Sequence, residues 1–545
     1  MVKVTYEPTE RYENPLAASL GLGADDIKRE AKLARLLEDL GGLINRPVAG
    51  DVTWRYAQAD GTGALPLPMD WANWPILGAR DVWGETQKHT WLVAEIAAPE
   101  AAQGGVFGFK VASNWRPMQG STDPQCLVYL DGKIAQALDG NHDEVILSQS
   151  AVPGAQHLVQ INAFTYDERP MVGFPTGLFL RDTRIETLWH RLSAAFEVAA
   201  RLPQTDARRH AMMETVECAL YALDRRAGQA GGLQASLPEA EEIAETLHTP
   251  VHDNKVPRIS AFGHSHLDVA WLWRVKHVRD KTARTFATVL NLMDEFPDFV
   301  FMYNQAVLFN FLKQDYPELW ARVVAKAKSG QFDIEGAMWV EPDVNISGGE
   351  ALVRQILRGR QFQIDEFGIT PRCVWLPDTF GYSAALPQIL AKSGMAFFVT
   401  SKLSWNDTDR HPFDTFLWRG IDGTKITSQL ITTQALEARD QRTNYNSDLS
   451  VSDVLGTWKR YEPKPLNDQL MMCFGHGDGG GGPTREMVQR GQVLARGLPG
   501  APKVKLEGLR AYLERLGPKL EERANDVPVW DGELYLQYHL SLIHI

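Results

Sequence analysis

The chain has 545 residues, of which 44% are hydrophobic and 23% are charged, and its net charge is −12 at neutral pH. A chain of this length and composition is typical of a globular protein with several domains. The acidic balance argues against nucleic acid or an anionic membrane as a partner, because both bind basic surfaces.

The cysteine content and the N-terminal sequence indicate the cellular compartment. The four cysteines are scattered without a CxxC pair, which predicts reduced thiols and neither a disulfide framework nor a zinc–thiolate site. The first residues lack the pattern of a signal peptide, and no run approaches 18 apolar residues. We therefore expect a cytoplasmic protein without membrane-spanning segments.

In the first half of the chain, the predicted secondary structure changes from helix to strands and back to helix. Residues 24–45 have helical periodicity, and from about residue 49 short alternating runs predict an antiparallel β-sandwich, at 91–96, 105–111, 126–130, 157–163 and 177–180. Six of the 16 tryptophans lie between Trp54 and Trp115. They are interpreted as core residues, with a carbohydrate-binding face as the alternative. Residues 184–248 are helical again.

From residue 257 onward, predicted strands alternate with predicted helices. We expect strands at 259–262, 299–303, 332–340, 373–376, 396–400 and 469–474, with helices at 275–295, 305–312, 318–328, 348–367, 384–393 and 484–498. Residues 417–431 alternate like a hairpin. This pattern predicts an α/β domain with a mostly parallel sheet.

Polar side chains follow four of these strands. His266 and Asp268 follow the first, and further clusters follow later strands, namely Glu341 with Asp343, Asp378, and His476 with Asp478. The carboxyl ends of parallel strands meet on one side, so these groups are expected to converge.

The converging residue types suit two kinds of chemistry. His266 and Asp268 are two residues apart and point the same way in extended chain, so with Asp378 they can bind a divalent ion such as zinc. Alternatively, a single His-x-Asp tripeptide such as 266–268 is an ordinary loop sequence without a functional role. Asp478 lies in a glycine-rich loop with no P-loop lysine. One metal-held carboxylate and one free to carry a proton are what glycoside cleavage needs.

Three motifs together resemble a known family. HLDVAW (266–271), WLPDTFGYS (375–383) and GDGGGGPT (477–484) are similar to glycoside hydrolase family 38, the retaining α-mannosidases, in its cytosolic/vacuolar branch. The resemblance covers residues 257–538. It implies an incomplete (β/α)7-type barrel catalytic domain, preceded by the β-sandwich and helical segments.

The resemblance also implies roles for single residues. His266, Asp268 and Asp378 would bind one divalent ion, zinc or else cobalt or another. Asp378 would also be the nucleophile, and Asp478 the general acid/base. Trp271 and Asp343 would bind the sugar. Terminal α-mannosides would be the substrates, and the oligomeric state of a full-length enzyme stays open, with a homo-oligomer as one of the alternatives.

The chain end departs from the family pattern. The family's fourth metal ligand, a later histidine, has no counterpart, so we do not assign that role to His476. After ELYLQYH (533–539) the chain reads LSLIHI, which we interpret as a non-native tail on an N-terminal fragment of weak or no activity. A divergent natural terminus is the alternative.

The expected organisation therefore has five parts. These are an N-terminal helical segment (1–48), the β-sandwich (49–186), a helical linker region (187–256), the truncated catalytic α/β domain (257–539) and the tail (540–545). A metal-dependent polysaccharide deacetylase and a non-catalytic carbohydrate-binding protein are the alternative functions. Released acetate, or mannose binding without turnover, would distinguish them.

Overall fold

The computed structural model describes residues 26–59, 61, 64–112, 115–118, 121–166, 168–226, 231–248 and 256–536. The predicted tail at 540–545 lies outside these residues. The contacts group the chain into two compact units. The first comprises Met1–Asn45, Asp182–Val251 and Gly497–Ala501, and the second comprises Arg46–Arg181, His252–Arg496 and Pro502–Ile545. The five predicted domain boundaries stay a prediction.

The described part of the first unit is helical. It contains α2 (Asp26–Gly41), α3 (Thr183–Arg201), α4 (Ala207–Ala222) and α5 (Gly232–Glu245). Aspartates begin two of these helices, since Asp182 accepts hydrogen bonds from the first backbone amides of α3 and Asp206 does so for α4. Inside the unit, Arg209 forms a buried ion pair with Glu30.

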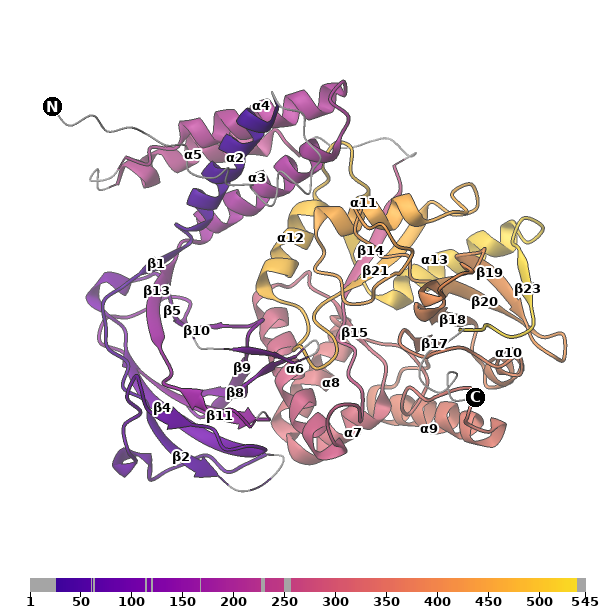
Figure 1. The fold of residues 1–545 in the computed structure, drawn as a ribbon, viewed down its shortest axis with the longest axis horizontal. Coiled ribbons are helices and arrows are strands. Elements are labelled where there is room, and N and C mark those ends of the chain that lie inside the picture. Colours follow the sequence, from indigo (N-terminus) through magenta and orange to yellow (C-terminus); the bar gives the residue numbers. More distant parts are fainter. Residues whose placement is uncertain are drawn as a thin grey trace. The chain divides into compact units, whose positions relative to one another are not determined.

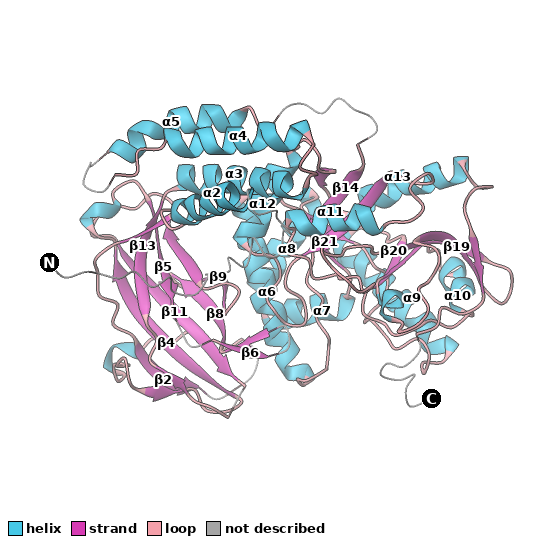
Figure 2. Ribbon diagram, turned by 45° about the horizontal axis from the view of Figure 1, so that its top comes forward, coloured by secondary structure: helices cyan, strands magenta, loops and turns pink. Residues whose placement is uncertain are grey.

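Two sheets built on antiparallel strand pairs open the second unit (Figures 1 and 2). One has the order β1 (Asn45–Pro47), β13 (Thr176–Arg181), β5 (Val106–Val111) and β10 (Glu144–Ser148). The other has the order β2 (Arg55–Ala59), β4 (Lys88–Ala97), β11 (Gln156–Thr165), β8 (Gln125–Leu130) and β9 (Lys133–Leu138). Both sheets contribute to a shared hydrophobic core that includes Trp54 and Trp83, so these two tryptophans are core residues.

Shorter elements decorate this region. The pairs β3 (Val82–Trp83) with β12 (Met171–Val172) and β6 (Arg116–Met118) with β7 (Ser121–Asp123) form two-stranded sheets. Short 3-10 helices lie at η1 (Trp71–Asn73) and η2 (Glu100–Ala102). The turn between β9 and β10, at residues 139–142, contacts the loop that follows β21.

The rest of the second unit is built around two further sheets. The first has the order β16 (Phe332–Ile334), β15 (Phe301–Tyr303), β14 (Arg258–Gly263) and β21 (Gln469–Phe474), with β22 (Lys503–Leu506) also paired to β14. All of these pairs are parallel. The second has the order β17 (Cys373–Leu376), β18 (Phe397–Thr400), β20 (Lys425–Leu430), β19 (Thr415–Arg419) and β23 (Val529–Asp531).

Only the β19–β20 pair is antiparallel among the described strands of these two sheets, and it forms the expected hairpin. Helices alternate with the strands: α6 (Val275–Glu295), α7 (Ala306–Asp315), α8 (Pro317–Ser329), α9 (Gly349–Phe367), α10 (Leu386–Lys392), α11 (Val451–Arg460), α12 (Arg485–Ala495) and α13 (Leu509–Glu522). The predicted mixed α/β class is confirmed. No described helix is long and apolar enough to cross a membrane.

One predicted strand is much shorter than expected. Residues 332–340 were expected to be extended, yet β16 ends at Ile334. The chain turns because Gly336 adopts a φ of 87°, where a Cβ atom would lie 2.4 Å from that of Asn304. The carboxylate of Glu335 fixes this turn by accepting hydrogen bonds from the backbone amides of Gly336, Arg372 and Cys373.

Candidate active site

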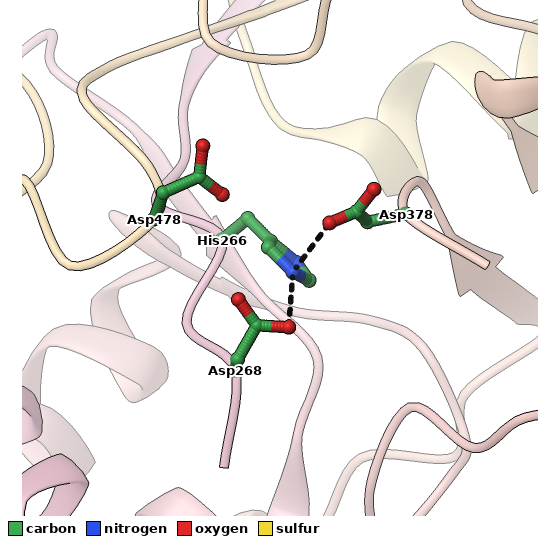
Figure 3. Close-up of side chains that lie close together, drawn as sticks. All are labelled: His266, Asp268, Asp378 and Asp478. Carbon is green, nitrogen blue, oxygen red and sulfur yellow. Dashed lines mark hydrogen bonds and ion pairs between the residues drawn. The ribbon is translucent and has the colours of Figure 1, made fainter. Parts of the chain in front are cut away.

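Four side chains from three strand ends meet in one cluster (Figure 3). His266 and Asp268 follow β14, Asp378 follows β17, and Asp478 follows β21. One ligand atom from each residue lies within 4.8 Å of the other three. The sequence-based expectation that these four residues converge agrees with this geometry.

The buried imidazole of His266 is the centre of the cluster. Its Nε2 lies 3.3 Å from Asp268 Oδ1 and 3.3 Å from Asp378 Oδ2. Its Nδ1 faces Glu341 Oε2 at 3.5 Å, and Glu341 in turn accepts a hydrogen bond from Asn304 Nδ2 at 2.8 Å. Burial acts to lower the pKa of His266, but the surrounding carboxylates, Glu341 first, raise it well above its usual value.

This donor set fits a divalent metal ion. Ligands bonded to tetrahedral zinc at about 2.0–2.1 Å lie about 3.3 Å from one another. Both contacts of His266 Nε2 have that length. An imidazole with carboxylates suits zinc and other borderline or hard divalent ions. In metal sites, a carboxylate that contacts the second ring nitrogen of a metal-bound histidine fixes the orientation of the ring. Glu341 has this place relative to His266.

Asp378 is held as an anion. Lys402 Nζ lies 2.8 Å from Asp378 Oδ1, and the lysine is only 5% exposed, with Nζ 3.5 Å from the ring centroid of Trp405. Burial alone would raise the pKa of Asp378. The hydrogen bond and charge of His266, together with Lys402, outweigh burial and lower this pKa to about 2.

Asp478 has the opposite tendency. Its backbone amide donates to His266 O at 2.8 Å, and Asn446 Nδ2 lies 3.4 Å from its Oδ2. Burial raises the pKa of Asp478 to about 6, and the negative charges of Asp378 and Asp268 add to this effect. Between the two pKa values, Asp378 is ionised while Asp478 carries a proton.

The other predicted residues differ in their placement. Trp271 is 44% exposed and its ring lies edge-on to that of Trp273, with centroids 5.3 Å apart, so a partly exposed aromatic ring follows Asp268 by three residues. Asp343 is exposed, lies outside the four-residue cluster, and accepts hydrogen bonds from the backbone amides of Asn345 and Ile346. Its sugar-binding role stays a prediction.

Two histidines near the motifs have other surroundings. His264 is fully buried, donates from Nδ1 to Met302 O at 3.0 Å and accepts from Trp375 Nε1 at 3.3 Å, which are structural contacts. His476 lies outside the metal-type cluster, and its ring centroid is 6.4 Å from that of His142.

Sequence reasoning missed Lys402, Tyr445 and Asn446. Lys402 lies two residues past the end of β18, in η3 (Lys402–Trp405), so its sequence signal is its place after a strand end. Tyr445 is 5% exposed, and its ring centroid is 5.4 Å from that of His266. Burial and the charges of Asp378 and Asp478 raise the pKa of this phenol, so its hydroxyl stays a donor.

Known proteins resemble the same part of the chain. Alpha-mannosidase 2C1 of Homo sapiens is 38% identical over 304 residues, which is 56% of this chain and 28% of that protein. Alpha-mannosidase of Saccharomyces cerevisiae is 38% identical over 324 residues, which is 56% of this chain and 27% of that protein. The chain thus spans little more than a quarter of the length of these relatives.

The chain is also similar to a solved structure and matches a family profile. The crystal structure of an alpha-mannosidase from Enterococcus faecalis V583 superposes with a TM-score of 0.41 and 20% identity, covering 51% of this chain and 31% of that one. The profile of the "Glycosyl hydrolases family 38 N-terminal domain" matches residues 257–533, which are 277 of the 545 residues. The chain therefore belongs to glycosyl hydrolase family 38, as the three motifs predict.

Proposed function

We propose that the protein is a retaining, exo-acting α-mannosidase that hydrolyses terminal α-mannosides through a covalent glycosyl-enzyme intermediate. In this proposal, the two mostly parallel sheets form an incomplete (β/α)7-type barrel. The observation that carries this proposal is the pair of carboxylates beside His266. Asp378 is ionised, with a pKa of about 2, while burial raises the pKa of Asp478 to about 6. Oxygens of the two lie within 4.8 Å of each other. Retaining enzymes place their carboxyl groups about 5–5.5 Å apart, and inverting enzymes about 6.5–9.5 Å apart.

The first chemical step joins the sugar to the protein. A carboxylate oxygen of Asp378 forms a bond to the anomeric carbon as the glycosidic bond breaks, and Asp478 gives its proton to the leaving oxygen. In the second step, Asp478 takes a proton from water. That water oxygen bonds to the anomeric carbon, and the carboxylate of Asp378 is released. Two inversions at one carbon retain its configuration.

Several side chains prepare these groups. Lys402 keeps Asp378 anionic and aligned at 2.8 Å. Glu341 orients His266 through the ring nitrogen remote from Asp378. The exposed face of Trp271 supplies a platform for the sugar ring.

His266, Asp268 and Asp378 are the residues that would bind a metal ion in this proposal, with zinc favoured and cobalt an alternative. When bound, such an ion supplies positive charge that polarises neighbouring sugar hydroxyls and favours the ionised form of Asp378. Asp478 is assigned to proton transfer instead of ligation, because its pKa is raised while that of Asp378 is lowered.

Trapping the intermediate tests the proposal. With Asp478→Ala and a dinitrophenyl α-mannoside, whose leaving group needs no proton, the first step should outrun the second. Mass spectrometry of the digest should then find one mannosyl residue on the peptide containing Asp378. The adduct should be absent from Asp378→Ala. Acetate release from acetylated sugars without mannose release would favour a deacetylase, and mannose binding without turnover would favour a binding protein.

A further inference from the structure

We propose that the β9–β10 turn of the sandwich region is a positioning device for the general acid/base, with Asn141 and His142 holding the loop that carries Asp478. We call residues 139–142 the clamp turn and residues 476–483 the acid loop. The clamp itself is a structural claim. Its catalytic consequence rests on the proposed function, because only there does Asp478 transfer a proton.

Two hydrogen bonds join the clamp turn to the acid loop. Asn141 Nδ2 donates to Gly480 O at 2.9 Å, and His142 Nε2 donates to Pro483 O at 3.1 Å. The acceptors stand two residues and five residues after Asp478. The β9–β10 turn therefore anchors the acid loop on the side that faces the sandwich. This turn does not belong to the two sheets whose strands precede the four site residues.

The clamp turn is itself rigidly built. Asp139 Oδ1 accepts from the backbone amide of Asn141 at 2.8 Å, from that of His142 at 3.0 Å, and from His142 Nδ1 at 3.1 Å. Both side chains of this ion pair are buried. Because both ring nitrogens of His142 face oxygens that can only accept, the protonated imidazole satisfies both. The carboxylate of Asp139 fixes the ring that reaches the acid loop.

The acid loop is shaped to receive this turn. Gly481 has a φ of 90°, and a Cβ atom there would lie 2.8 Å from His142 Cε1 and 2.9 Å from Asp139 Oδ2. Only glycine fits this close approach without a shift. The loop is closed at its base by mutual backbone hydrogen bonds of 2.9 Å between His476 and Gly482.

The backbone of Asp478 requires outside support. Its φ is 53°, in the left-handed region that non-glycine residues seldom adopt, and such conformations persist only where the surroundings enforce them. Inside the barrel region, its amide bonds to His266 O at 2.8 Å. The clamp supplies restraint on the other side of the loop.

A second sandwich contact reaches the same loop through α6. Gln125 Oε1 accepts from Lys281 Nζ at 2.7 Å, and both side chains are buried. A Cβ atom at Gly479 would lie 2.8 Å from that same Nζ. The acid loop thus packs against a lysine that the sandwich holds in place.

Hydrogen exchange tests the clamp without requiring turnover. In Asn141→Ala, amides of residues 476–482 should exchange about tenfold faster, as expected when one anchoring hydrogen bond is lost. His142→Leu should do the same, and His142→Gln, which keeps a donor toward Pro483 O, should restore most of the protection. The half-buried Asn141 provides the test if His142→Leu does not fold.

Thr288→Val is the matched control. Thr288 Oγ1 on α6 accepts from the sandwich amide of Ala137 at 3.0 Å and lies outside the acid loop. This variant should leave amide exchange in residues 476–482 unchanged. Unchanged exchange in Asn141→Ala, or an equal increase in Thr288→Val, would overturn the clamp.

Leaving-group dependence tests the catalytic consequence. For Asn141→Ala, kcat/KM should fall about tenfold on a methyl α-mannoside, which needs a proton donor, and less than about twofold on a dinitrophenyl α-mannoside. An equal fall on both substrates would overturn the positioning role while leaving the clamp in place. If Asn141→Ala lost exchange protection but the wild type hydrolysed neither mannoside, the clamp would stand. That result would count against the proposed function alone.

Discussion

Replacing Asp478 by Asn should make the metal-free protein more stable at neutral pH. The neutral amide has the shape of the protonated acid and can still face Asn446 Nδ2, which lies 3.4 Å from Asp478 Oδ2 in the wild type. The carboxylate, by contrast, is partly buried and lies near Asp378 and Asp268, which disfavours its ionised form. The substitution removes the cost of this ionisation.

The size and sign follow from the pKa of Asp478. It is about 6 in the folded protein, compared with about 3.9 for an aspartate in an unfolded chain. Between these values the folded state binds more protons than the unfolded state, so the wild type loses stability as pH rises. A difference of about 2 pKa units corresponds to about 3 kcal/mol. Asp478→Asn should exceed the wild type by only about 0.5 kcal/mol near pH 4 and by about 3 kcal/mol above pH 7.

Urea unfolding in the presence of a chelator, at half-unit steps from pH 4 to pH 7.5, measures this difference directly. Asp440→Asn, at an exposed aspartate, controls for the loss of one negative charge. A difference between Asp478→Asn and the wild type that stays constant with pH would refute the reasoning. A difference that shrinks as pH rises would show that the environment of Asp478 favours its anion.

Three further predictions concern the neighbours of the two carboxylates. Lys402→Met should raise the pKa of Asp378 by removing a cation 2.8 Å away, and carboxylate infrared or NMR titration of the metal-free protein should detect the rise; an unmoved pKa would contradict it. Glu341→Gln should weaken zinc binding about 10–100-fold, because His266 loses a contact that fixes its orientation. Competition with a chelator measures this affinity, and Asp478→Asn should keep the wild-type value. Trp271→Ala should raise KM more than it lowers kcat and leave the melting temperature nearly unchanged, because the ring is 44% exposed; a large loss of stability would contradict this.

The cluster was predictable because its signals are local. His266 and Asp268 stand two residues apart directly after a buried strand, and Asp378 and Asp478 follow other parallel strands at the same ends. The direction of parallel strands then brings them together without knowledge of packing. Lys402 obeys the same rule but was missed, because a serine and a lysine after a strand do not stand out from an ordinary loop.

Other features depend on contacts far apart in sequence. Helix α11 was not predicted, although Ser450 accepts a hydrogen bond from the Asp453 amide at its start. Its Gly456 lowers helix propensity, yet a Cβ atom there would lie 1.9 Å from Gln434 O, so packing requires glycine. The clamp between Asn141 and Gly480 joins residues 339 positions apart, and no local pattern encodes such a pair.

The stereochemistry of the first product tests the central claim most directly. Proton NMR should follow hydrolysis of an aryl α-mannoside by the zinc-loaded protein, before the free sugar mutarotates. Nucleophilic attack by Asp378 followed by attack of water predicts α-mannose as the first-formed sugar. β-Mannose as the first product would mean a single inversion and would exclude Asp378 as the nucleophile.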